Sequence, residues 1–534
     1  MIKKLFNKKI NSISIAALMV ASSSLVSRLL GVIRDHILAG KFGAGNELDV
    51  YYAAFRVPDM VFNLVVLGAL SAGFIPVFTQ LINDQKEQQK AWDLVNNVLN
   101  VLGVLMLVVV GVLFVCAEPL IKLITPGFNA QKLAETVWLT RIMFLSPILL
   151  GISSVVGGVL QSYKRFLIYS LSPIFYNLGI IAGATWLVPS WGLAGLAWGV
   201  SLGSAAHLLV QVPSIWNLGW RYQCLIDWRN KQLRVIFRMM TARTLSLVIN
   251  QVNLLVEMIF ASMLAGGSLA IFNLANNLQS FPVGIFGLSF AIAAFPAIAA
   301  SAFDTEKLLY YFSKTIRQVF YFIVPSTAVL ILLSEQMVRL ILGGGKFDAW
   351  DASLTVDTVS CFALSLFAQA TIPLLVRFYY ARHDSRTPLR LGLIASVVNI
   401  ALNAWLVKWL GVAGLALAFS ISSIVQFALL IIFLRIEIGH LDSLKLLRSL
   451  ARMLAAVAVA GLVVTSTKAW WSVLAVNQPW GVWYQFIVPA TLLLGSYLIM
   501  SYLFACPELL DLLNHSKGRW SKLKSKELDK AKVI

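Results

Sequence analysis

Long apolar runs recur along the whole chain, separated by short polar segments. Fourteen such runs can be placed, at roughly 12–33, 50–81, 92–117, 133–160, 165–188, 192–216, 235–264, 268–300, 308–333, 352–380, 388–408, 411–434, 449–467 and 482–505. A helix needs about 20 apolar residues to cross a hydrocarbon core of roughly 30 Å. The runs are continuous, whereas the strands of an outer-membrane barrel alternate apolar and polar residues. The pattern therefore predicts an all-α polytopic membrane protein with 14 transmembrane helices.

The runs contain an internal repeat. The motif Gly192-Leu-Ala-Gly-Leu-Ala197 recurs as Gly411-Val-Ala-Gly-Leu-Ala416, 219 residues later. Two more pairs have nearly the same offset, namely Asn177 with Asn399 and Pro76 with Pro296. Because the repeating unit contains an even number of runs, both copies keep one orientation, as in transporters whose halves are related by an axis along the membrane normal.

The repeat suggests a division of the chain into four parts. We expect an N-terminal six-helix lobe at 1–220, a C-terminal six-helix lobe at 221–435, two further transmembrane helices (13 and 14) within 436–506, and a basic tail at 507–534. The tail contains seven Lys and Arg residues and is expected to meet anionic lipid headgroups.

The formal net charge of +19 fits a membrane topology better than a nucleic-acid partner. With the N-terminus in the cytoplasm, 31 of the 43 Lys and Arg residues fall in cytoplasmic segments and 8 in loops on the other side. This bias is the positive-inside rule, so both termini are predicted to be cytoplasmic. Nucleic acid is not expected as a partner, because no basic stretch interleaves aromatic residues as a binding groove would.

Enzyme and cofactor signatures are missing from the sequence. There is no GxxxxGK[ST] motif for ATP, and Gly343-Gly-Gly-Lys346 lacks the required spacing. The four cysteines and five histidines are dispersed without the spacing of a disulfide framework or a zinc site. We therefore expect a transporter, neither an enzyme nor ATP-driven, with no cofactor unless Na⁺, H⁺ or the membrane potential drives it.

Charged residues lie within and between the first two apolar runs. They are Arg28, Arg34, Asp35, Asp49 and Arg56. Ionisable side chains are costly in hydrocarbon, so they usually face a bundle interior or a water-filled cavity. The cluster predicts a polar pocket that binds a charged substrate.

The eighth run carries a polar face. Asn273, Asn276, Asn277 and Ser280 follow the spacing i, i+3, i+4 and i+7, which puts them on one side of a helix. Polar residues also join helices by hydrogen bonds in any membrane bundle. We favour a cavity lining, because four such groups exceed what packing requires.

Glu257 lies well inside the seventh run, on one helical face with Asn250 and Asn253. An unpaired carboxylate is costly at such a depth, so it is expected to be protonated or to have a cationic partner. Asn399 and Asn403 in the eleventh run offer neutral oxygens of the kind that hard cations accept. Glu257, Asn399 and Asn403 could form a coupling site for Na⁺ or H⁺, and the alternative is a buried acid hydrogen-bonded to its neighbours.

The opening stretch resembles the MurJ (MviN-like) lipid II flippases of bacteria, in the multidrug/oligosaccharidyl-lipid/polysaccharide exporter superfamily. The pattern SRxLGxxRD, FGAG, Asp, AF and Pro is present as Ser27-Arg28, Leu30-Gly31, Arg34-Asp35, Phe42–Gly45, Asp49, Ala54-Phe55 and Pro58. Further matching motifs are Thr125-Pro-Gly-Phe128, Tyr163-Lys-Arg-Phe166, Gly345-Lys-Phe-Asp348 and Arg386-Thr-Pro388.

The resemblance implies export of a lipid-linked peptidoglycan precursor across the bacterial cytoplasmic (inner) membrane by alternating access, for cell wall biosynthesis. Membrane lipids would be the other partners. Arg34 matches one of the family's cavity arginines, and its planar fork suits phosphate oxygens.

The sequence departs from the family pattern at two places. Phe62-Asn63 stands where the family usually has Arg-Arg, and Asn276-Asn277 where it has Asp-Arg. Arg56 lies seven residues before Asn63 on the same helical face and could partly replace the missing charge. Two alternatives to the peptidoglycan precursor therefore stay open: export of another polyprenyl-linked oligosaccharide, or a MurJ-like scaffold that transports nothing.

Overall fold

The computed structural model describes residues 13–67, 73–84, 87–302, 304–439, 443–473, 481–511 and 513. Within these ranges the chain is helical and has no strand, apart from an isolated bridge between Gly344 and Phe347. The predicted all-α class is confirmed. The predicted basic tail lies almost wholly outside the described residues, as do Lys3, Lys4, Lys8 and Lys9 before the first helix.

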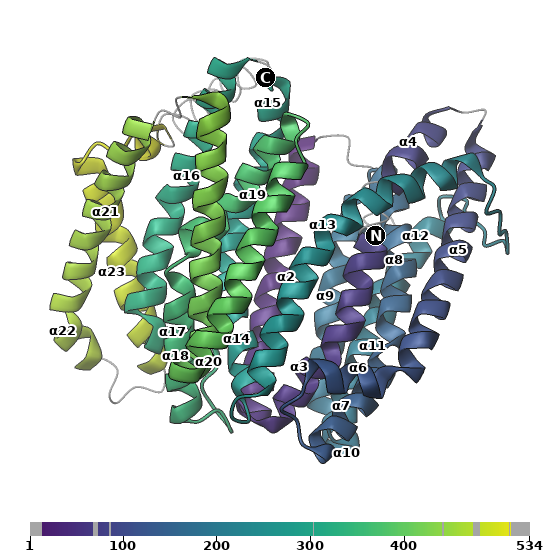
Figure 1. Cartoon of the computed structure of the whole chain (residues 1–534), viewed down its shortest axis with the longest axis horizontal. Coiled ribbons are helices and arrows are strands. Elements are labelled where there is room, and N and C mark those ends of the chain that lie inside the picture. The colour runs from purple at the N-terminus through teal and green to yellow at the C-terminus, as the bar shows by residue number, and fades with distance from the viewer. Residues whose placement is uncertain are drawn as a thin grey trace, which may run out of the picture. The chain divides into compact units, whose positions relative to one another are not determined.

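The helices gather into two compact units, which are described separately. The first contains residues 1–274, 341–351 and 403–415. Its helices, shown from purple to teal in Figure 1, are α2 (Ile13–Phe42), α3 (Asn46–Val61), η1 (Phe62–Leu67), α4 (Ile75–Asn83), α5 (Gln88–Val115), α6 (Ala117–Ile124), α7 (Ala130–Met143), α8 (Leu145–Ser162), α9 (Phe166–Ala182), η4 (Gly183–Leu187), α10 (Val188–Trp191), α11 (Ala194–Leu209), α12 (Val212–Trp216) and α13 (Lys231–Ser262).

The second unit contains residues 275–340, 352–402 and 416–534. Its helices are η5 (Val283–Leu288), α15 (Ser289–Ala300), α16 (Thr305–Leu332), α17 (Ser334–Ile341), α18 (Ala349–Ala363), α19 (Leu366–Ala381), α21 (Ser443–Ser466), α22 (Lys468–Val473) and α23 (Gly481–Leu503). Two further helices, α14 (Ser268–Pro282) and α20 (Arg386–Ile438), are divided between the units, as are the last residue of α17 and the first three residues of α18. The division of the chain into lobes at 220 and 435 stays a prediction.

The described residues contain nine helices that are long and apolar enough to cross a membrane, or ten if the bent pair α18 and α19 is one span. One of the nine is α20, whose 53 residues cover the predicted spans eleven and twelve. The non-helical backbone of Gly411, at φ 55° and ψ −132°, marks the turn between those spans. The chain is therefore a multi-pass membrane protein, and the count of fourteen stays a prediction.

Local geometry repeats at the offset that the sequence indicates. Gly192, at φ 57° and ψ −145°, has nearly the same backbone conformation as Gly411. Three residues later, Gly195 packs against the backbone of Leu187, and Gly414 packs in the same way against Leu406. Left-handed backbone favours glycine at the first of these positions, and close helix contact favours it at the second. These two requirements explain why both copies of the motif have glycine at the same two places.

Two further features repeat within the separate units. Ser201 donates to the Ile142 carbonyl at 3.2 Å, and Ser420 donates to the Cys361 carbonyl at 2.8 Å. A six-residue π-helix follows α3 as η1, and another follows α14 as η5. π-helical turns cost regular hydrogen bonding and occur mostly at functional sites. Their recurrence supports two copies of one ancestral unit.

The segment that precedes α13 is fixed along α5 by three asparagines. The Asn96 amide bonds the Arg221 carbonyl at 3.1 Å, and the Asn100 amide bonds the Gln223 carbonyl at 2.8 Å. Between them, Asn97 exchanges two hydrogen bonds with the backbone of Asp227, at 2.9 and 2.8 Å. An extended segment has no backbone ladder of its own, so these amides satisfy its polar groups.

Candidate functional site

Arg34 on α2 is held in place by two partners of the first unit, one on the same helix and one on α9. Its Nε and one terminal nitrogen donate to Asp35 Oδ1 at 3.0 and 2.8 Å. The other terminal nitrogen donates to Asn177 Oδ1 on α9 at 3.2 Å. The Arg34 side chain is 22% exposed and that of Asp35 is 9% exposed. Arg28 lies six residues earlier on α2 and is half-buried.

Asn177 is a site residue that sequence reasoning used only as a repeat marker. Its amide nitrogen lies 3.3 Å from Ser27 Oγ and 3.1 Å from the Pro173 carbonyl, while its oxygen accepts from Arg34. The amide is therefore oriented by its own partners before it meets the guanidinium. Its position 143 residues from Arg34 gave no local signal of this contact.

A second charged group lies one helix further on. Asn63 on η1 donates to Asp59 Oδ2 at 2.9 Å, and Arg56 interacts electrostatically with both Asp59 and Glu257. Glu257 is 2% exposed, and its Oε1 has no hydrogen-bond partner among the described residues. The sequence predicted that Glu257 is either protonated or paired with a cation, and its electrostatic interaction with Arg56 leaves both alternatives as predictions. Asp59 was missed, although its spacing of three residues from Arg56 places it one helical turn away.

Asp49 is the centre of a buried network that we call the Asp49 clasp, formed by Asp49, Lys132, Gly267 and Ala270. Asp49 Oδ2 accepts from Lys132 Nζ at 2.6 Å and from the Gly267 backbone at 2.7 Å. Its Oδ1 accepts from the Ala270 backbone at 2.8 Å. The carboxylate therefore caps the first turn of α14, where the backbone N–H groups have no partner within the helix.

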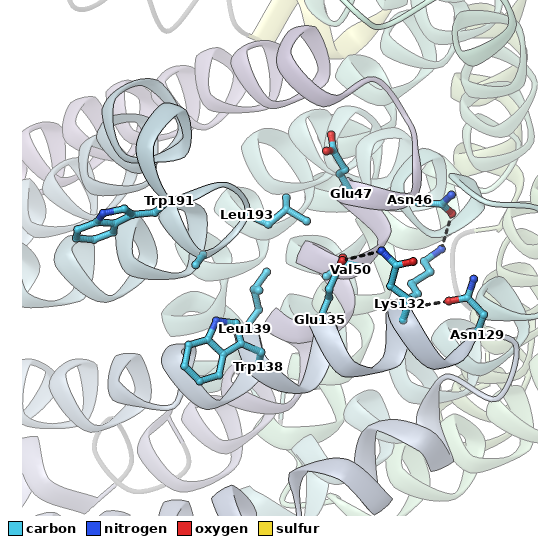
Figure 2. Close-up of a pocket in the computed structure, with 12 residues that line it drawn as sticks. Asn46, Glu47, Val50, Asn129, Lys132, Glu135, Trp138, Leu139, Trp191 and Leu193 are labelled. Atoms are coloured by element: carbon cyan, nitrogen blue, oxygen red, sulfur yellow. Dashed lines mark hydrogen bonds between the residues drawn. The ribbon is translucent and has the colours of Figure 1, made fainter.

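The lysine of the clasp is itself surrounded by partners. Its ammonium also bonds Asn46 Oδ1 at 3.0 Å (Figure 2). It lies 4.2 Å from the centre of the Phe128 ring. The side chains of Lys132 and Asp49 are 12% and 3% exposed. The sequence predicted charge at Asp49 but did not identify Lys132 as its partner, because 83 residues separate the two.

Two glycines explain how the turns around the clasp pack so closely. Gly267, at φ +93°, lies against the carbonyl oxygen of Ala44, and Gly127 lies against that of Ser262. A side-chain carbon at either glycine would overlap these backbone atoms. Ala44 of the FGAG motif and Gly127 of the TPGF motif thus make close backbone contacts with the turn that joins α13 to α14.

The segment 341–351, which the first unit also contains, is bound to the same turns. The Lys346 backbone donates to the Gly40 carbonyl at 2.8 Å. Asp351 Oδ2 accepts from the Ala44 backbone at 2.8 Å. Glu47 lies 3.8 Å from the Lys346 ammonium, a loose and exposed ion pair. The GKFD motif therefore belongs to this set of contacts, which the sequence did not indicate.

The polar face predicted on α14 is present. Asn273, Asn276, Asn277 and Ser280 are all half-buried, whereas the residues between them are mostly buried. The Asn276 oxygen accepts from Gln279 at 2.9 Å, and Ser280 donates to the Asn277 carbonyl at 2.9 Å. These bonds lie within one helix, and the predicted cavity lining stays a prediction.

The three residues of the predicted coupling site are all buried. Asn399 is 2% exposed and donates to Ser422 at 3.2 Å within the second unit, and Asn403 is 0% exposed. Glu257 and Asn403 belong to the first unit, and Asn399 belongs to the second. A site that joins the three stays a prediction. No group of three or more His, Cys, Asp or Glu side chains within the described ranges could hold a metal ion.

Known proteins share both the fold and the sequence pattern. The chain is similar to an inward closed conformation of lipid II flippase MurJ, with a TM-score of 0.75 and 22% identity over 91% of this chain and 98% of that chain. It is also similar to an inward-facing MATE family transporter of the MOP superfamily, with a TM-score of 0.66 and 15% identity over 80% of this chain and 99% of that chain.

Relatives from bacteria extend the likeness in sequence. A probable lipid II flippase MurJ from Vibrio cholerae serotype O1 is 29% identical over 88% of this chain and 91% of its own length. A lipid II flippase MurJ from Burkholderia cenocepacia is 26% identical over 84% of this chain and 89% of its own length. A family model described as lipid II flippase MurJ matches residues 38–482. Since that match covers most of its 534 residues, the chain belongs to the MurJ family.

Proposed function

We propose that the protein is a flippase that moves lipid II, the lipid-linked peptidoglycan precursor, from the inner to the outer leaflet of the bacterial cytoplasmic membrane. It would act by alternating access and serve cell wall biosynthesis. Membership of the MurJ family and the likeness to a solved MurJ structure support this proposal. In this proposal the protein performs no chemical step and uses no ATP, and both termini lie in the cytoplasm.

The observation that carries the proposal is the fixed guanidinium of Arg34. A guanidinium has five N–H donors, and Asp35 and Asn177 accept from three of them among the described residues. The remaining donors suit the oxygens of a pyrophosphate, which the planar fork binds in pairs. Because Asp35 and Asn177 already orient the side chain, little conformational entropy is lost when phosphate binds.

The groups around Arg56 would serve the same substrate. Arg56, Asp59, Asn63 and Glu257 place one cation, two carboxylates and an amide in adjoining turns of α3, η1 and α13. Such a set can bind sugar hydroxyls and peptide groups, which both donate and accept hydrogen bonds. The asparagine face of α14 offers more groups of the same kind.

A gradient of Na⁺ or H⁺, or the membrane potential, would drive the cycle. Glu257 is the carboxylate of the first unit best suited to coupling, because it is buried and one of its oxygens is unpaired among the described residues. Replacing it by glutamine should make transport insensitive to the gradient that drives it. Unchanged gradient dependence in Glu257→Gln would exclude this carboxylate from coupling.

A second candidate is export of another polyprenyl-linked oligosaccharide. This candidate is favoured by Asn63, which stands where the family usually has arginine and which donates a hydrogen bond to Asp59. A cavity with fewer cations would bind a less anionic headgroup. A monophosphate-linked glycan is one example.

The test is rescue of bacteria that are depleted of their own lipid II flippase. We expect the protein to restore growth and to expose labelled lipid II on the outer leaflet. Arg34→Ala should abolish rescue, and Arg34→Lys should weaken it because the fork is lost. Arg339→Ala is the matched control, since its side chain is 57% exposed and pairs with the exposed Glu335.

The outcomes separate the candidates. Failure of the wild-type protein to rescue, with export of another labelled polyprenyl-linked glycan, would favour the second candidate. Failure in both assays, with Arg34→Ala also silent, would leave a scaffold that transports nothing.

A further inference from the structure

A pocket of about 590 Å³ opens beside the Asp49 clasp, within the first unit. It is formed where α3, α7 and α10 meet the start of α11 (Figure 2). Its volume lies within the range of small-molecule sites, roughly 300–1,000 Å³. None of its lining residues belongs to the charged groups around Arg34 and Arg56 that the proposed function uses.

One part of the lining is aromatic and open to ligand. Trp138 on α7 and Trp191 on α10 lie on the same side of the pocket, with Leu139 and Leu193 near them (Figure 2). The two indoles are 58% and 55% exposed, so their faces are accessible from the pocket. Indole rings provide large, rigid contact area at low entropic cost, and their negative faces attract weakly positive C–H groups.

The other part of the lining offers both donors and acceptors. Glu47 and Glu135 are exposed carboxylates, and the amide nitrogens of Asn46 and Asn129 are donors. The Gln131 amide donates to Glu135 at 3.3 Å, and its oxygen is a further acceptor in the lining. Polar groups of both kinds near an apolar platform are typical of sites that recognise hydroxyl-rich ligands.

The charges of the lining disfavour an anionic ligand. Its only cation is Lys132, and Asp49 and Asn46 already bind that ammonium at 2.6 and 3.0 Å. The first turn of α3 carries Glu47, and Asn129 caps α7 by accepting from the Lys132 backbone at 2.8 Å. The partial positive charges at the N-termini of α3 and α7 are therefore already balanced by side-chain oxygens, so they attract phosphate only weakly.

We infer that this pocket binds a neutral glycan of one or two sugar rings. The apolar face of a pyranose ring packs on indole, and its hydroxyl and acetamido groups exchange hydrogen bonds with the amides and carboxylates. The inference rests on the proposed function for the source of the glycan, which would be the sugar headgroup of the exported lipid after its release from the arginine site. The pocket would then hold the headgroup on the side of the membrane where the clasp lies.

The test is direct binding of a neutral disaccharide to the purified full-length protein in detergent or nanodiscs. Saturation-transfer NMR with N,N′-diacetylchitobiose should give a signal on the sugar protons. Trp138→Leu and Trp191→Leu should each weaken binding about three- to tenfold, the magnitude expected for one lost aromatic contact. Both side chains are more than half exposed, so the variants should fold.

Trp186→Leu is the matched control, because Trp186 is 77% exposed and does not line the pocket. Equal signals in the wild type and in the Trp138→Leu/Trp191→Leu double variant would overturn the inference. The inference would also be overturned if an acidic disaccharide bound more tightly than N,N′-diacetylchitobiose. The same holds if the protein bound a glucosamine dimer but not its acetylated form. Since transport is not needed for the signal, a failure of lipid II rescue with intact sugar binding would count against the proposed function alone.

Discussion

The Asp49 clasp provides the sharpest prediction about how the first unit opens. Asp49→Asn keeps the shape of the side chain but removes the charge that Lys132 Nζ meets at 2.6 Å. The asparagine oxygen can still accept a hydrogen bond from the backbone N–H of Gly267 or of Ala270. It cannot accept hydrogen bonds from both of these groups and from the Lys132 ammonium as well. The variant therefore leaves a largely buried ammonium without its counter-ion.

The magnitude follows from the burial of the pair. Breaking a buried ion pair by removing one partner costs about 3–5 kcal/mol. Because asparagine retains part of the network, we expect about 2–3 kcal/mol, near the value of a hydrogen bond to a charged group. Each 1.4 kcal/mol is a factor of ten, so the turn before α14 should separate from α3 roughly 30- to 150-fold more often.

The assay measures access to a cysteine placed under the clasp. Ser268 is 7% exposed at the start of α14, and Ser268→Cys can be introduced after the four native cysteines are changed to serine. Its reaction with a maleimide reports local opening when opening is rapid. We expect Asp49→Asn to raise the reaction rate by the factor given above.

A double-mutant cycle with Lys132→Met tests whether the effect comes from the ion pair. The two substitutions together should cost clearly less than the sum of their separate effects. Glu47→Gln is the control, since its ion pair with Lys346 is exposed and spans 3.8 Å. An unchanged rate in Asp49→Asn, or additive effects in the cycle, would refute the reasoning.

Two further substitutions test the contacts that the glycines and asparagines make. Gly267→Ala should lower the free energy of unfolding by at least about 2 kcal/mol, because its φ of +93° is unfavourable for alanine and the new carbon would overlap the Ala44 carbonyl. Gly111→Ala, which meets nothing within 4 Å, should leave the melting temperature in detergent nearly unchanged, and equal effects of the two would contradict this account. Asn97→Ala should release the backbone of Asp227 and speed tryptic cleavage between residues 217 and 230, without a similar change elsewhere in the chain. Cleavage at the wild-type rate would show that Asn97 does not hold this segment.

The sequence by itself determined the class of protein and indicated its internal repeat, while the count of fourteen transmembrane helices stays a prediction. Apolar runs follow from the cost of polar side chains in hydrocarbon, and their helical form follows from the cost of unpaired backbone groups there. Both costs act on every segment separately. The glycines at 192 and 411 were recognisable for a similar reason. Their left-handed backbone is a local property, and the structure shows it at both positions. The charged positions from Arg28 to Arg56 were also visible, because a charge in an apolar run stands out without knowledge of its partner.

Only the tertiary structure decided which groups meet. Lys132 with Asp49 and Asn177 with Arg34 are contacts across 83 and 143 residues, and no periodicity in the sequence encodes such pairs. The pocket between Trp138 and Trp191 is likewise formed by helices that are distant in sequence. Hydrophobic patterning selects which face of a helix is buried, whereas a site requires specific atoms at distances near 3 Å. That precision comes from the packing of whole helices, which in the Asp49 clasp depends on glycines that allow three turns to touch.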